Sequence, residues 1–141
     1  MQIESKIGKS ESGSEIIFNF ITDFRNFKNI IPQDKVSDWQ ANEESCSFKV
    51  DPIGKMGMKI FEIEPHTLIK IKSDPAISQY NFTMWIQIKE VGPTDSRIKI
   101  TLEPEISKML IPMVKGPLKQ FVDSLVDKME TFNYGDLNES S

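Results

Sequence analysis

Near its N-terminus the chain alternates first with the period of a strand and then with that of a helix. Residues 2–7 alternate polar and apolar side chains, and one side of this segment carries Ile3, Ser5 and Ile7. Ser12 and Glu15 have the spacing of a capping box, and apolar residues then recur at helical intervals from position 17 to position 24. A second apolar patch stops at Pro32, whose ring disfavours a helical conformation of the residue before it. This part of the chain therefore predicts one strand followed by two short helices.

From residue 36 to residue 103 the period is two, and turn residues interrupt it at the spacing of consecutive hairpins. The pattern predicts six strands, at residues 36–41, 46–51, 58–64, 68–73, 79–90 and 97–103. The apolar side of these strands carries Cys46, Phe48, Val50, Ile69, Ile71, Phe82, Met84, Ile86, Ile88, Ile98, Ile100 and Leu102. Lysines dominate the opposite side, so we expect an antiparallel sheet with one face in water and the other covered.

The last quarter of the chain returns to helical spacing and supplies the cover. Between Ile106 and Met129 apolar residues recur every three or four positions, as on one broad stripe of a helix. Pro112 and Pro117 each remove a backbone donor, so we expect a kink, or a short first helix that leads into a regular one. Residues 134–141 are polar and are expected to form a disordered tail, which leaves residues 1–133 as a single domain.

Composition narrows the classes of function. The chain has 141 residues and a formal net charge of −4, with both signs scattered along it, so phosphate backbones and anionic membranes should be repelled on average. With one cysteine, Cys46, and one histidine, His66, neither an intramolecular disulfide nor a multi-histidine or cysteine metal site can form. The sequence has no apolar leader and no run of about 18 apolar residues. We therefore expect a cytoplasmic protein that binds no nucleic acid, inserts stably in no membrane and needs no cofactor.

The order of one strand, two short helices, six strands and a long helix resembles the START-like superfamily, which includes Bet v 1-type proteins and the polyketide cyclase/dehydrase group. Local similarities are the helical entry that ends at Ile31-Pro32, the hairpin at residues 48–60 and the closing segment at residues 115–119. The resemblance implies an α+β helix-grip fold, in which a curved antiparallel sheet of seven strands wraps around the C-terminal helix. It also implies a deep, largely apolar cavity between the sheet and that helix. Members bind lipids, sterols, polyketides or plant hormones, and some are enzymes, so the fold alone selects no function.

The apolar side of the sheet offers little chemistry. Its polar positions are Ser5, Cys46, Ser73 and Tyr80. Neither an acid–base pair nor an activated nucleophile can be assembled from them. We interpret Cys46 as a buried, inert thiol and His66 as an exposed turn residue. Tyr80 either orients a ligand oxygen or stands at the edge of a pocket with its hydroxyl in water.

The sequence thus predicts a protein that binds a small hydrophobic or amphipathic ligand, lipid-like or polyketide-like, and shows no catalytic machinery. The expected wall of the pocket is Phe20, Phe48, Met58, Ile71, Tyr80, Phe82, Met84, Met113, Phe121 and Leu125. An empty cavity of about 300 Å³ would cost on the order of 7 kcal/mol, so we expect Phe and Met side chains to narrow it. Residues 51–57, with Ile53 and Met56, form either a mobile flap at its mouth or a plain hairpin turn.

Two alternatives remain open at this point. One is an enzyme that resembles the aromatase/cyclase members of the superfamily, which inward polar residues from the loops would support. The other is a protein-interaction domain of the chaperone-activator type, which would use the outer face of the sheet around Trp85 and need no cavity. On that face Trp85 either packs against Lys70 and Lys72 or contributes to a homodimer interface.

Overall fold

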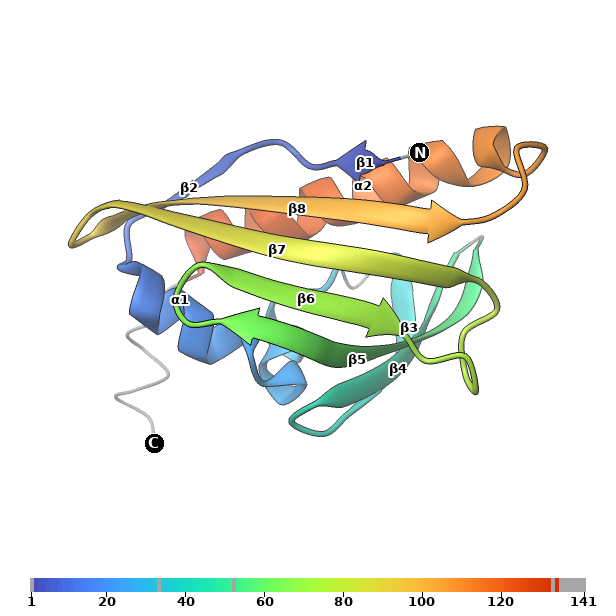
Figure 1. Cartoon of the computed structure of the whole chain (residues 1–141), viewed down its shortest axis with the longest axis horizontal. Coiled ribbons are helices and arrows are strands. Elements are labelled where there is room, and N and C mark those ends of the chain that lie inside the picture. The colour runs from blue at the N-terminus through green and yellow to red at the C-terminus, as the bar shows by residue number, and fades with distance from the viewer. Residues whose placement is uncertain (1, 33, 52, 133, 135–141) are drawn as a thin grey trace.

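A curved antiparallel sheet grips the C-terminal helix in a computed structural model that describes residues 2–32, 34–51, 53–132 and 134 (Figure 1). The elements, in chain order, are β1 (Ile3–Glu4), β2 (Gly8–Ser10), α1 (Ser14–Ile21), a 3₁₀ helix η1 (Phe24–Asn29), β3 (Val36–Ala41), β4 (Ser45–Val50), β5 (Gly54–Glu64), β6 (Leu68–Ser73), β7 (Asn81–Gly92), β8 (Asp95–Glu105) and α2 (Ile111–Thr131). The strand order is β1-β8-β7-β6-β5-β4-β3, and β2 also pairs with β8. The predicted helix-grip architecture is confirmed.

The N-terminal strand is interrupted between β1 and β2, whereas the sequence predicts a single strand at residues 2–7. Ile3 and Ser5 are buried as expected, but Ile7 is exposed, so the alternation fails after Ser5. At the break the Ser5 hydroxyl accepts a hydrogen bond from the Ile100 N–H at 2.8 Å and donates one to the Lys6 carbonyl at 2.7 Å. A side chain thus replaces part of the backbone ladder, and the chain returns to β8 only at Gly8.

Helix α1 begins one residue later than the capping box predicts. Its N-cap is Gly13, which has no side chain that could cap the helix. Instead, the Glu90 carboxylate on β7 accepts a hydrogen bond from the Ser14 N–H at 3.0 Å. The carbonyl of Ser12 accepts a hydrogen bond from the Ser96 hydroxyl at 2.7 Å, so this segment is held to β8. The predicted cap at Ser12 is therefore wrong, because a carboxylate from the sheet takes that role.

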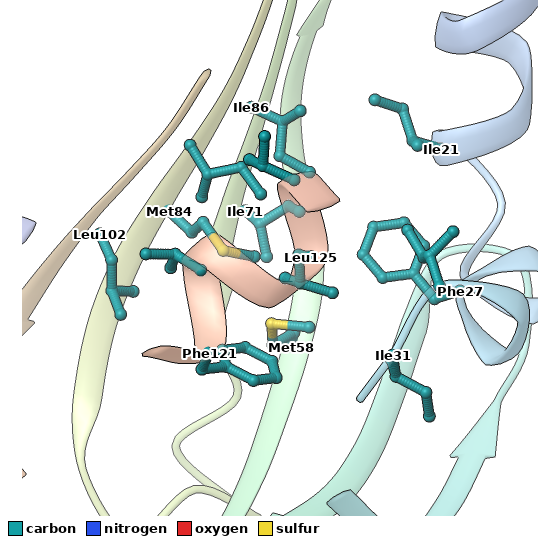
Figure 2. Close-up of a cluster of buried hydrophobic side chains, with 14 of the residues drawn as sticks. Ile21, Phe27, Ile31, Met58, Ile71, Met84, Ile86, Leu102, Phe121 and Leu125 are labelled. Atoms are coloured by element: carbon teal, nitrogen blue, oxygen red, sulfur yellow. The ribbon is translucent and has the colours of Figure 1, made fainter. Parts of the chain in front are cut away.

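The apolar face of α2 lies across the concave face of the sheet and closes the core (Figures 1 and 2). All twelve residues that the sequence assigns to the apolar side of the strands are buried. Along α2 the buried residues are Val114, Leu118, Phe121, Val122, Leu125, Val126 and Met129. No helix within the described residues is long and apolar enough to cross a bilayer.

The start of α2 differs from the predicted stripe. The helix is continuous from Ile111 to Thr131, with Pro112 in its first turn, where its missing N–H has no partner within the helix. Residues 107–110 form a turn rather than a first helix. Consequently Met109 and Met113, both placed on the apolar stripe by their spacing, are 87% and 69% exposed.

The core extends beyond the predicted domain end at residue 133. Tyr134, the first residue of the predicted tail, is 2% exposed, and its ring lies 5.1 Å from that of Phe20 and 5.1 Å from that of Phe132. Its hydroxyl donates a hydrogen bond to the Met129 carbonyl at 2.9 Å, and burial raises the pKa of this phenol. The rest of the predicted tail, residues 135–141, lies outside the described residues.

Candidate functional site

Most of the space in which the resemblance implies a deep cavity is filled by the protein's own side chains. Eight of the ten predicted wall residues belong to the buried core: Phe82, which also lines the pocket described below, and the seven residues Phe20, Phe48, Met58, Ile71, Met84, Phe121 and Leu125. Figure 2 shows Met58, Ile71 and Met84 directed from the sheet toward Phe121 and Leu125 of α2. The ring centroids of Phe48 and Phe121 are 6.0 Å apart, which bridges the sheet and the helix. The seven residues pack the interior, and none of them lines the mainly apolar pocket at the end of the fold.

That pocket lies at one end of the fold, where β8 passes into α2 and the β4–β5 and β6–β7 connections converge. It is lined by Ile53, Met56, Tyr80, Asn81, Phe82, Leu102, Pro104, Ile106, Val114 and Leu118. The space between these atoms, including the open mouth, is about 300 Å³, but only about 20 Å³ of it can hold the centre of a water molecule. This is room for about one or two waters. A larger guest fits only if side chains of the wall move.

Two of the predicted wall residues line this pocket and one points away from it. Tyr80, just before β7, and Phe82, the second residue of β7, line the pocket. Met113 is exposed on the first turn of α2, because the helix turns the next residue, Val114, toward the sheet. The predicted role of Met113 as a wall residue is therefore wrong in this structure.

The β4–β5 connection is a hairpin turn, and it contributes part of the wall. Val50 pairs with Gly54, and Gly54 has a φ of +113°, a conformation that L side chains rarely adopt. A Cβ atom at this position would lie 2.2 Å from the Oε1 atom of Gln79, so the turn packs closely on the β6–β7 connection. Ile53 and Met56 are each 6% exposed and face the pocket.

The β6–β7 connection, residues 74–80, is held along the first residues of β5. The Gly57 N–H donates to the Ser78 hydroxyl at 2.7 Å, and the Gly57 carbonyl accepts the Asp74 N–H at 2.9 Å. The Gln79 N–H donates to the Lys55 carbonyl at 3.0 Å. These bonds fix the backbone that carries Tyr80, so this part of the wall is positioned by the sheet.

Structural comparison finds the same architecture in solved proteins of very different sequence. A START superfamily protein from Mycobacterium smegmatis matches with a TM-score of 0.72 and 13% identity, over 99% of each chain. A norcoclaurine synthase point mutant from Thalictrum flavum matches with a TM-score of 0.71 and 12% identity, over 100% of this chain and 96% of that one. The fold is START-like.

A third match extends the range of proteins with this START-like fold. The di-domain ARO/CYC BexL from the BE-7585A biosynthetic pathway has a TM-score of 0.69 and 7% identity, over 92% of this chain and 45% of that chain. No family model and no curated protein matches the sequence. At these identities the matches establish the fold and leave the function to be argued from the site.

The pocket of this START-like domain carries little polar chemistry among the described residues. Tyr80 and Asn81 are its two polar lining residues, and Asn81 is exposed at the rim. No group of three or more His, Cys, Asp or Glu side chains within the described part of the chain could hold a metal ion. An acid–base pair cannot be formed from a tyrosine and an amide alone at neutral pH.

Cys46 lies on β4 in the core of the START-like domain, and its thiol is predicted to be inert toward labelling reagents. Burial raises the pKa of Cys46 from 9.0 to about 12, which lowers its thiolate fraction about a thousandfold near pH 8. We expect negligible reaction of the native protein with a disulfide reagent that releases a coloured thiolate, and stoichiometric reaction in guanidinium chloride. Rapid stoichiometric labelling under native conditions would contradict the buried position.

The outer face of the sheet confirms the packing of Trp85 on a lysine. The Lys70 ammonium lies 5.9 Å from the centroid of the Trp85 ring and 5.3 Å from that of Phe61. The Lys72 ammonium lies 4.0 Å from the Phe61 centroid. A homodimer through the outer face stays a prediction.

His66, in the β5–β6 turn, is exposed as expected, and its ring also contacts that of Phe18 edge-on, with 5.6 Å between the ring centroids.

Proposed function

We propose that this protein binds a small hydrophobic or amphipathic molecule in the pocket at the N-terminal end of α2. One observation carries the proposal: side chains from four separate parts of the chain converge there on an apolar space that the core does not fill. The wall is mainly aliphatic and aromatic, and its two polar residues are the half-buried Tyr80 and the exposed Asn81. A ligand with an apolar body and one polar end matches this distribution.

The small free volume of the pocket is compatible with such a role. At about 24 cal/mol per Å³, an empty space of 20 Å³ destabilises the protein by only about 0.5 kcal/mol. The free protein therefore needs no permanent occupant. A ligand can enter by displacing side chains of the wall, and Met56, with three rotatable bonds and a soft thioether, is the residue best suited to adapt.

Proteins of the same fold support a role in binding small molecules. Norcoclaurine synthase from Thalictrum flavum has been solved with dopamine and hydroxybenzaldehyde, and BexL is an ARO/CYC of a biosynthetic pathway. Because the described residues of the present pocket supply no acid–base pair, we propose binding rather than catalysis for this chain.

The uptake of an apolar fluorescent probe tests the location of the pocket. Leu118→Ala widens the pocket and is expected to increase binding of N-phenyl-1-naphthylamine several-fold, measured by its fluorescence. Leu125→Ala is the matched control, because it makes the same change two turns further along α2, at a residue 1% exposed that does not line the pocket. We expect no gain of uptake from the control.

Equal uptake by the two variants would remove the argument for this pocket, and a gain confined to Leu125→Ala would place the site in the predicted central cavity. Native mass spectrometry of protein purified from its own host then identifies the ligand class. A retained mass in the range of a lipid or polyketide supports the proposal.

A further inference from the structure

The pocket at the N-terminal end of α2 has a wall without charge. None of the described residues that line it is an aspartate, a glutamate, a lysine, an arginine or a histidine. The wall therefore offers no counter-charge to a carboxylate, a phosphate or an amine. A charged group that leaves water for such a site loses its hydration without compensation. A ligand with a charged end inside the pocket is thus disfavoured.

The charged residues next to the lining residues along the strands belong to the opposite face of the sheet. Lys55 precedes Met56 on β5, and Glu103 and Glu105 stand on either side of Pro104 on β8. Successive side chains along a strand point to opposite faces. These three charged side chains are therefore directed away from the pocket that Met56 and Pro104 line.

The lysines around the start of α2 also leave the pocket without a cation. Lys108 and Lys115 are exposed, and neither lines the pocket. Lys119 is bound to Asp123 at 3.1 Å, on the outer side of the helix. A ligand carboxylate can meet the exposed lysines only by staying in water, where an ion pair contributes little.

Tyr80 supplies the hydrogen-bonding group that the pocket does have. It is half-buried and packs against the core, and its hydroxyl forms no hydrogen bond with the described residues. The hydroxyl of Tyr134, in contrast, already donates to the Met129 carbonyl. A tyrosine hydroxyl can donate a hydrogen bond to an uncharged oxygen. The other polar lining residue, Asn81, is exposed and therefore hydrated.

We propose that the pocket selects apolar ligands whose polar end is uncharged and accepts a hydrogen bond from the Tyr80 hydroxyl, such as an ester or a ketone, and that it discriminates against fatty acids and amines. The inference rests on the proposed binding function of the pocket and adds the chemical class of the ligand. An ester or ketone oxygen leaves water at a lower cost than a carboxylate does, and one donor is enough to replace its hydration.

Competition with a fluorescent probe tests this selectivity. Methyl decanoate and decanoate share one acyl chain and differ in the charge of the polar end. In the Leu118→Ala variant loaded with N-phenyl-1-naphthylamine, we expect methyl decanoate to displace the probe at a concentration about tenfold lower than decanoate at neutral pH. Decylammonium, of the opposite charge, should also need the higher concentration.

Two further variants in the same background test the role of the wall. Tyr80→Phe keeps the ring and should raise the required concentration of methyl decanoate about fivefold, in the range of one hydrogen bond, without changing that of undecane. Tyr134→Phe is the matched control, because it removes a hydroxyl outside the pocket, and it should change neither. Ile106→Lys adds an ammonium group at a half-buried position of the wall and should reverse the preference toward decanoate.

The outcomes separate this inference from the proposed function. Displacement by decanoate at the same concentration as the ester, or a lower one, would overturn the selectivity and leave the binding function standing. If Lys108→Gln with Lys115→Gln then abolished the binding of decanoate, the polar end of the ligand would be assigned to these lysines. Equal effects of Tyr80→Phe and Tyr134→Phe would overturn the role of Tyr80. Failure of the probe and of every competitor to bind would overturn the proposed function itself.

Discussion

Replacing Met84 by glutamate is expected to unfold the protein or to leave it only marginally stable. Met84 is 1% exposed on β7, where its neighbours across the sheet are Ile71 and Leu102, and its side chain points toward α2 (Figure 2). The variant loses the packing of the thioether and buries a carboxyl group with no partner. Each change costs several kcal/mol, against a total free energy of unfolding of about 5 to 15 kcal/mol for a domain of this kind. Urea unfolding followed by circular dichroism measures the loss.

Gln87→Glu is the matched control for this prediction. Gln87 lies three residues further on the same strand, is exposed, and pairs across the sheet with Lys99. The same carboxylate on this face should change the free energy of unfolding by no more than about 0.5 kcal/mol. If Met84→Glu were as stable as Gln87→Glu, the assignment of the two faces of β7 would be wrong.

The sheet could be predicted well because the alternation of residues along a strand is a direct consequence of burial on one face. In β7, Phe82, Met84, Ile86 and Ile88 are all buried, as their period of two requires. The bounds of β3 and β6 agree with the predicted ranges, because turn residues mark both ends of these strands. Local sequence contains this information, and no distant contact is needed to read it.

The cap of α1 could not be predicted in the same way, because its partner is distant in sequence. Ser12 and Glu15 have the right spacing, yet the Ser14 N–H donates to Glu90, 76 residues away. A carboxylate on a neighbouring strand competes with the local cap once the sheet has formed. The spacing of Ser12 and Glu15 indicates only the local cap and contains no information about the distant Glu90 carboxylate that replaces it.

The pocket in the structure lies away from most of the predicted wall residues for a different reason. Periodicity identifies which side chains face the interior. It does not show where the side chains of the helix and of the sheet leave an unfilled space between them. Met113 and Val114 both belong to the broad stripe, and only the position of the first turn of α2 decides that Val114 lines the pocket while Met113 is exposed. Ile53 and Met56 did carry a signal, since two apolar residues in a Pro/Gly-rich connection are unusual unless they cover something.

Tyr134→Ala is expected to destabilise the protein by about 3 to 5 kcal/mol, in the range of aromatic-to-alanine changes in cores. The ring packs against Phe20 of α1 and against Phe132, which also contact each other with 4.7 Å between the ring centroids, so its removal leaves a cavity beside this aromatic cluster. Sequence reasoning places this residue in a polar tail, because a single aromatic among polar neighbours has no period. From that assignment no effect on stability is expected.

Tyr134→Phe separates the two contributions of this side chain. It keeps the ring contacts and removes only the hydrogen bond to the Met129 carbonyl, so a loss of about 1 kcal/mol is expected. Urea unfolding of the two variants beside the unchanged protein gives both values. If Tyr134→Ala lost less than about 1 kcal/mol, the ring would contribute little to the core and the domain would end at residue 133. The expected order, with the alanine variant well below the phenylalanine variant in stability, would show that the Tyr134 ring contributes to the aromatic packing between α1 and the end of α2.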